Sequence, residues 1–208
     1  MEYVFLIVIL IFSVVIHELS HGAMANYLGD PTAKNEGRLT LNPLKHLDPI
    51  GSVILPIFLV LMSQLTGGGI IFGWAKPVPI NPYNFRDQKY GSAKTALAGP
   101  ASNLLIALIF GLALRFFPQI LFVSGLGLMF SYIIYINILL AVFNLLPIPP
   151  LDGSHILFTF LPRSFLTLKM FLSQFGFFFL LIVIFFLFPL LRFVVNAVFG
   201  LIVGFPLF

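Results

Sequence analysis

Two histidines and a glutamate lie close together in the first apolar segment, in the sequence His17-Glu18-Leu19-Ser20-His21. On a helix, a spacing of four places both imidazoles on one face, about a turn apart, so both can bind a single ion. Glu18 lies about 100° around the helix from His17, within reach of a metal-activated water without being a ligand itself. This H-E-x-x-H arrangement is typical of zinc hydrolases. We therefore predict a zinc site, rather than two packing histidines, because ionisable groups in an apolar helix need strong compensation.

A hydrolytic zinc site uses three protein ligands and leaves one position for water. The chain contains no cysteine, so the third ligand must be a histidine, an aspartate or a glutamate. Asp152 is the best candidate, because it follows the helix-breaking sequence Pro147-Ile148-Pro149-Pro150 and could turn inward there. An equally supported reading is that Asp152 only caps a helix that starts near Gly153. Asp48 and His155 are weaker alternatives.

The composition shows where such a site must lie. Apolar residues of the AVILMFWYC set make up 60% of the 208 residues, and charged residues make up 9%. A water-facing surface normally needs about a quarter of its residues charged, so most of this chain must face lipid. The net charge of +4 is spread over loops and forms no basic run, which excludes a nucleic-acid partner. We expect no removable signal peptide, because the N-terminus lacks a basic flank and a cleavage site.

Apolar segments long enough for membrane helices alternate with turn residues along the chain. The first ends at Gly29-Asp30-Pro31, a glycine C-cap followed by a proline. The fold class that we predict is an all-α polytopic membrane protein: a helical bundle with a three-helix catalytic core. Residues 1–208 form one domain, with the core over about 3–160 and accessory helices over about 165–208. The predicted helices are residues 3–28, 93–117, 120–146, 165–188 and 190–208.

Short β-strand or re-entrant elements are expected between the first and third apolar segments. Arg38–Asn42 alternates polar and apolar residues, which predicts a short edge strand. Residues 50–65 form an apolar stretch that is short for a span, and we predict that residues 50–80 dip into the bilayer and return to the same face. A short span followed by a returning loop would satisfy the same topology. His46 lies in the polar loop between them, where we expect it to be solvated.

Two further motifs extend the pattern. One motif of the site-2 protease family, N-x-x-P-x-P-x-L-D-G, resembles the sequence Asn144-Leu145-Leu146-Pro147-Ile148-Pro149-Pro150-Leu151-Asp152-Gly153. The G-x-x-x-N element of the same family resembles Gly99-Pro100-Ala101-Ser102-Asn103. With H-E-x-x-H they occur in that family's order, over about residues 13–160. The resemblance implies an intramembrane zinc metalloprotease of the compact prokaryotic type, without a PDZ or CBS module. It implies one Zn²⁺ per chain with Asp152 as third ligand, Glu18 as catalytic carboxylate and Asn144 as a polar active-site residue.

The direction of the helices can be predicted separately. Asp152 must meet His17 and His21, so the first helix and the helix ending at Leu146 should run the same way. An odd number of spans must then lie between them. Because the loops on both sides of residues 50–65 carry Lys and Arg, we expect them at the cytoplasmic face of the cell membrane, with the site opening toward it.

The expected reaction is hydrolysis of transmembrane or membrane-associated protein substrates, as in regulated intramembrane proteolysis or the clearance of signal-peptide remnants. Glu18 is expected to be the general base, and Asn144 and Asn103 to orient the substrate. Asn103 has an equally supported role as an interhelical hydrogen-bonding residue. A helical substrate must unwind, so an exposed strand edge at Leu39–Leu41 or Val78–Ile80 is our candidate clamp, with Leu39, Leu41, Val78 and Ile80 as contacts. A surface turn is an equally supported interpretation of either segment.

Two alternatives remain open at this stage. A membrane metalloprotease with a glutamate as third ligand is weaker, because the remaining glutamates, Glu2 and Glu36, lie outside suitable helices. A metal-binding transporter or receptor would need the ligands but no general base. The two C-terminal apolar blocks are expected to be lipid-facing scaffold rather than a substrate gate. The sequence identifies neither the substrate nor an accessory regulator.

Overall fold

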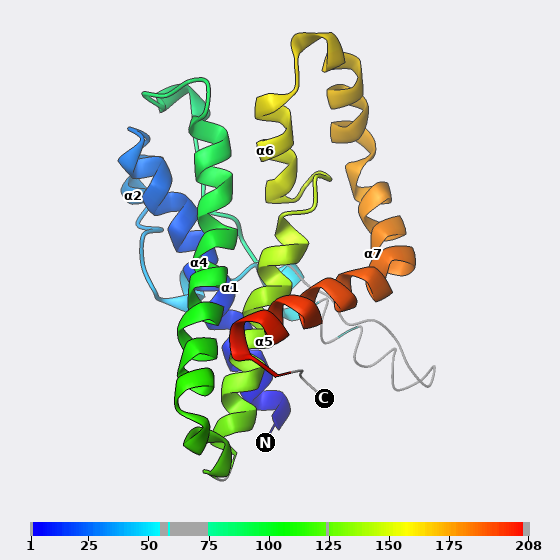
Figure 1. Cartoon of the computed structure of the whole chain (residues 1–208). Helices are drawn as coiled ribbons and strands as arrows, with labels where there is room; N and C mark the ends of the chain where they lie inside the picture. Colours follow the sequence, from blue (N-terminus) through cyan, green and yellow to red (C-terminus); the bar gives the residue numbers. More distant parts are fainter. Residues whose placement is uncertain (1, 55–57, 59–74, 124, 206–208) are drawn as a thin grey trace.

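The chain folds into a bundle of long helices, seen in a computed structural model that describes residues 2–54, 58, 75–123 and 125–205 (Figure 1). Within these residues, four helices are long and apolar enough to cross a bilayer: Val4–Tyr27, Gly91–Phe116, Leu126–Asn144 and Phe186–Val203. The protein is therefore a multi-pass membrane protein built from helices, as predicted.

Three helices form the centre of the bundle: α1 (Glu2–Tyr27), α4 (Gly91–Phe116) and α5 (Leu126–Asn144). Helix α4 packs against both neighbours, and α1 also contacts α5. Gly29 ends α1 in the left-handed conformation with a φ of 108°. The Arg86 amide then donates to the Leu28 carbonyl over 2.8 Å, which fixes the approach to α4 beside the end of α1.

This return connection sets the direction of the central helices. Figure 1 shows α4 running opposite to α1, and α5 running the same way as α1. The predicted parallel arrangement of the first helix and the helix before Asp152 is thus confirmed, with α4 between them. The segment of residues 50–80 begins with a π-helix over Pro49–Ile54 (η2), and its described part does not support the predicted re-entrant element. Its continuation at 55–57 and 59–74 lies outside the described residues.

A strand was expected over Arg38–Asn42, and that prediction is wrong. The described residues contain helices, turns and bends but no β-strand. Local side chains occupy the backbone groups that a ladder would need: the Asn42 amide donates to Thr40 Oγ1, and His46 Nε2 donates to the Thr40 carbonyl. Asn42 also caps the short helix Pro43–Lys45 (η1), so the chain turns instead of extending. The segment Val78–Ile80 lacks a regular strand as well.

The chain ends in α6 (Asp152–Phe160) and α7 (Leu166–Val203). Pro189, where we predicted a break between two helices, lies inside α7, whose axis turns sharply along its length (Figure 1). A core of seven buried residues joins α7 to the central helices: Ala107, Leu114, Ile134, Ile138, Val195, Phe199 and Val203.

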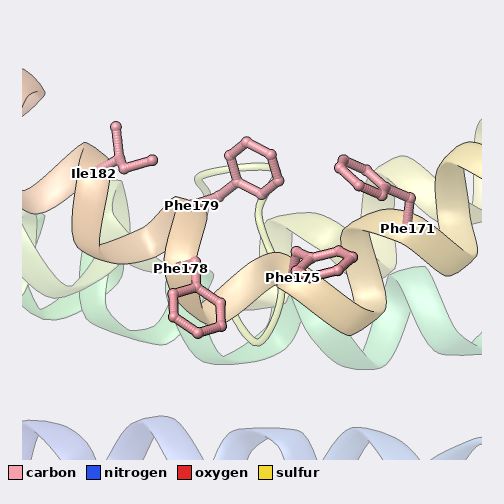
Figure 2. A pocket seen from close by; sticks show the side chains of 5 residues that line it. All are labelled: Phe171, Phe175, Phe178, Phe179 and Ile182. Atoms are coloured by element: carbon pink, nitrogen blue, oxygen red, sulfur yellow. The ribbon is translucent and has the colours of Figure 1, made fainter.

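The first half of α7 presents a different surface. Figure 2 shows an apolar pocket there, formed by one face of the helix and lined by Phe171, Phe175, Phe178, Phe179 and Ile182. No polar group lines it, so it suits contact with lipid tails better than chemistry. On the other side, Gly176 packs closely against the Pro149 backbone, so α7 braces the segment that leads to Asp152. The scaffold role of the C-terminal blocks stays a prediction.

Candidate metal centre

A histidine pair on α1 and an aspartate at the start of α6, far apart in the sequence, converge at one point. The Nε2 atoms of His17 and His21 are 3.0 Å apart, and Asp152 Oδ2 lies 3.1 Å from the first and 3.3 Å from the second. Ligands held at about 2.0–2.2 Å in a tetrahedral zinc site lie about 3.3 Å from one another. Within the described chain, these three residues form the group able to hold one ion.

The hydrogen bonds on the far side of each ring determine which nitrogen carries the proton. His21 Nδ1 lies 2.7 Å from the Thr95 carbonyl oxygen, which can only accept, so this nitrogen is the donor. His17 Nδ1 lies 2.6 Å from Asn103 Oδ1. Both imidazoles in their neutral forms therefore present bare Nε2 atoms to Asp152.

In these neutral forms, three electron-pair donors face one another. Asp152 Oδ2 is buried and has no hydrogen-bond partner among the described residues. Mutual repulsion and the cost of an unpaired buried carboxylate oxygen would both be relieved by a cation. The donor set of two imidazoles and one carboxylate is one that Zn²⁺ accepts in catalytic sites. The residues present therefore fit the metal.

Gly99 keeps open the space beside the two rings. A Cβ at this position would lie 2.6 Å from both His17 Nε2 and His21 Cε1, and closer still to His21 Nε2. A side chain of any size would collide there. The first residue of the predicted G-x-x-x-N element is thus a glycine because α4 passes directly over the imidazoles.

Asp152 directly follows the proline-rich turn and is not a helix cap. Leu151, with extended backbone, is the residue that precedes α6, and Asp152 occupies its first turn, where the helix dipole favours a carboxylate. Gly153 packs against the carbonyl oxygens of Leu145 and Leu146, so the turn closes back onto the end of α5. The capping interpretation of Asp152 is therefore wrong.

The weaker candidates lie elsewhere. Asp48 Oδ1 accepts the amides of Ile50 and Gly51 at the start of η2. His155 is exposed on α6. His46, expected to be solvated, is buried with 1% of its surface exposed, because its Nε2 donates to a backbone carbonyl within a tight turn.

Glu18 and Asn144 make contacts of their own. Glu18 is half-buried, and its Oε2 accepts the backbone amide of Val78 over 2.8 Å. Asn144 stands at the last position of α5, and its Nδ2 donates to the Leu140 carbonyl over 2.9 Å. An amide nitrogen carries two hydrogens, so this bond leaves one donor on Asn144.

Asn103 is fully buried and joins all three central helices. Its Nδ2 donates to the Ser13 carbonyl over 3.2 Å and to Asn137 Oδ1 over 2.9 Å, and Asn137 Nδ2 in turn donates to Ser13 Oγ. The structure thus favours its interhelical role. Sequence reasoning missed Asn137, Ser13 and Thr95; a lone buried amide in a strongly apolar helix was the signal for Asn137.

Comparison with known proteins agrees with these motifs. The model of Peptidase family M50 matches residues 119–183. YwhC of Bacillus subtilis (strain 168) is 40% identical over 169 residues, which cover 76% of this chain and 69% of that protein. The chain belongs to peptidase family M50.

Two further proteins also match the chain. Rip2 of Mycolicibacterium smegmatis is 36% identical over 156 residues, 72% of this chain and 55% of that protein. A protein of Methanocaldococcus jannaschii is 34% identical over 90 residues, 42% of this chain and 46% of that protein. All three relatives bear the name zinc metalloprotease. No solved structure matches the chain at a significant level.

Family membership and the apolar helices together identify a zinc-dependent metalloendopeptidase of the membrane, of the site-2 protease type. The region matched by the M50 family model contains α5, the proline-rich turn and Asp152. The histidine pair lies outside it, on α1, and is brought to Asp152 by the packing of α1 and α6 against α4.

Proposed function

We propose that this chain cleaves peptide bonds of transmembrane or membrane-associated proteins, with zinc held by His17, His21 and Asp152. The observation that carries the proposal is the convergence of His17 Nε2, His21 Nε2 and Asp152 Oδ2 within 3.3 Å of one another. Bound there, Zn²⁺ would supply Lewis-acid chemistry, activating a water as nucleophile and polarising the scissile carbonyl.

Glu18 is the general base of this proposal. It follows His17 on α1, so its carboxylate can reach a water beside the ligands, accept a proton and return it to the departing amide nitrogen. Its contact with the Val78 amide uses Oε2 and supports this role, since Oε1 remains for the water.

Asn144 is proposed to orient the substrate carbonyl or to stabilise the developing oxyanion. It stands at the end of α5, at the start of the turn that carries Asp152, and its spare amide hydrogen supports this role. Asn103 is instead proposed to act on His17, because none of its surface is exposed.

Substrate contact is proposed along the connection between α1 and α4. Leu39 and Val78 both approach α1 at Gly22, one residue beyond His21. Val78 is 5% exposed and Leu41 is 56% exposed, so Leu41 has the surface to meet a substrate directly. Ile80 is half-buried and packs against the apolar cluster of Ala25, Leu28 and Phe85.

The site is proposed to open toward the cytoplasm. His17 and His21 lie in the second half of α1, toward the end where the chain turns toward α4. Lys34, Lys89 and Lys94 are exposed around that end, and Arg115 lies near the opposite end of α4. An excess of Lys and Arg is typical of cytoplasmic loops.

Purified full-length protein in liposomes, with a single-span model substrate, tests the proposal. Glu18→Gln should keep one zinc per chain, measured by metal analysis, and lose cleavage by roughly 10²-fold or more. Normal cleavage by this variant would refute the assigned base. Retained zinc without any cleavage by the wild-type protein would instead favour a non-proteolytic metal-binding transporter or receptor, which the family comparison does not favour.

A further inference from the structure

Arg38 is a buried cation whose hydrogen-bond acceptors are backbone carbonyls of the connection that leads to α4. It is 5% exposed, and its Nη2 donates to the carbonyl oxygens of Lys76 over 2.8 Å and Pro77 over 3.2 Å. The extended segment Lys76–Ile80, which we call the strap, is thereby anchored beside α1. The Lys76 amide adds a second anchor by donating to the His46 carbonyl over 2.9 Å.

The strap has an unusual distribution of hydrogen-bond donors. Pro77 and Pro79 have no N–H, so Val78 carries the donor between them, and that N–H is bonded to Glu18 Oε2. Proline also restricts the residue before it to extended backbone, which stiffens the strap around Val78. The Val78 side chain packs against α1 at Gly22, with Leu39 beside it.

The Pro77 carbonyl and the Val78 N–H belong to the same peptide group. In a planar trans peptide these two groups point in opposite directions, so one peptide unit has the Arg38 guanidinium at its oxygen and the Glu18 carboxylate at its nitrogen. A cation at the carbonyl polarises the peptide and strengthens its N–H as a donor. Arg38 and Glu18 are therefore coupled through a single peptide bond.

We infer that Arg38 is a positioning residue for Glu18, an inference that rests on the proposed role of Glu18 as general base. A glutamate side chain has several rotatable bonds, and efficient proton transfer requires that it be held at hydrogen-bonding distance from the water. The Val78 N–H holds Oε2 and leaves Oε1 free. Arg38 fixes the direction of that N–H without contacting a metal ligand.

The kinetic test compares Arg38→Gln, Arg38→Lys and Val78→Pro in the full-length protein. Arg38→Gln and Val78→Pro should each lower kcat about tenfold or more, with KM within about twofold and zinc still at one per chain. The double variant should be no slower than the slower single variant, because both remove the same contact. Arg38→Lys, which keeps a cation, should fall between the wild type and Arg38→Gln.

Two control variants distinguish a loss of Glu18 positioning from a general disruption of the fold. Arg86→Gln removes an exposed arginine from the same connection and should leave kcat unchanged. Val78→Ala removes packing but keeps the N–H, and should be faster than Val78→Pro. The inference would be overturned if Arg38→Gln kept the wild-type kcat or lost its zinc. It would also be overturned if the losses in kcat of the two single variants multiplied in the double variant.

A second measurement needs neither zinc nor activity. In metal-free protein labelled with ¹⁵N-valine, the Val78 amide should exchange slowly with solvent, and Arg38→Gln and Glu18→Gln should each accelerate that exchange about tenfold. Unchanged exchange in Arg38→Gln would overturn the inference, even if the wild-type protein proved to cleave nothing. A wild-type protein without cleavage but with the expected exchange would refute only the proposed function.

Discussion

The side-chain oxygen of Asn103 lies 2.6 Å from Nδ1 of His17, and the same amide contacts Ser13 on α1 and Asn137 on α5. One buried side chain thus orients a candidate ligand and joins the three helices that surround it. Partners of this kind fix the tautomer of a ligating histidine and raise its basicity.

Replacing Asn103 should therefore weaken zinc binding without touching the metal. Asn103→Ala is expected to raise the zinc Kd about 10- to 100-fold, because His17 loses the acceptor that fixes its tautomer. Ser102→Ala, on the same helix, removes a hydroxyl that bonds within α4 and is the matched control. Competition with a chromogenic chelator measures both. Equal Kd values for Asn103→Ala and wild type would contradict the assigned contact.

Zinc should stabilise the wild-type fold, and Asp152 should be required for that effect. At free zinc near 100 times Kd, the free energy of unfolding should rise by about 2.7 kcal/mol over the chelated protein. Asp152→Ala should abolish this difference, whereas His155→Gln should retain it. Thermal unfolding in mild detergent, with and without chelator, provides the measurement. Full zinc occupancy in Asp152→Ala would point to another third ligand.

Gly99→Ala tests whether open space beside the imidazoles is required. The added methyl group would lie 2.6 Å from His17 Nε2, so the rings must move and zinc occupancy should fall well below one per chain. The matched control is Gly200→Ala on α7, where the nearest atom to an added methyl is 4.0 Å away. That control should be neutral or more stable by about 0.5–1 kcal/mol, as expected for a helical glycine. Full zinc binding by Gly99→Ala would show that the imidazole rings can shift to make room for the methyl group, so that the open space is not required.

Asp30 gives a prediction for pH. Burial alone would raise its pKa, but hydrogen bonds from Thr32, Asn84 and the Asn81 amide outweigh that effect and hold the pKa of its carboxyl below the usual value. A carboxyl with a depressed pKa stabilises the fold above its unfolded pKa of about 4, and this stabilisation is lost as the pH falls through the lower folded value.

Asp30→Asn should consequently lower the free energy of unfolding by about 1–3 kcal/mol at pH 7, because charge-assisted bonds to the strap's continuation are lost. Below about pH 4 the wild type and the variant should converge. Glu36→Gln, at an exposed carboxylate, is the control. Thermal unfolding in detergent from pH 7 to pH 3 measures the difference. A gap that stayed constant over this range would exclude Asp30 as its cause.

Local sequence determined much of this protein. The apolar segments set the membrane helices, because each must satisfy its backbone hydrogen bonds internally. The spacing of His17 and His21 alone placed both rings on one face of α1. The prolines after Asn144 fixed where α5 ends, since proline cannot continue a helix.

Other elements were misjudged because their determinants are not periodic. The strand expected at Arg38–Asn42 is absent, because Thr40, Asn42 and His46 satisfy its backbone groups locally. Helix α7 continues through Pro189, where the hydropathy pattern suggested two helices. Bent helices with an internal proline are tolerated in membranes when neighbours compensate for the lost bond.

The sequence by itself predicted the histidine pair, a candidate third ligand in Asp152 and the motifs that carry them, since these depend on residue types and on local spacing. Only the tertiary structure decided that Asp152 faces both imidazoles instead of capping α6. It also showed that Asn137 and Ser13 complete the support of His17. It showed, too, that one peptide unit links Arg38 to Glu18. Each of these contacts joins residues more than thirty positions apart in the chain. Such contacts arise from how the helices pack, and a local pattern contains no information about that packing.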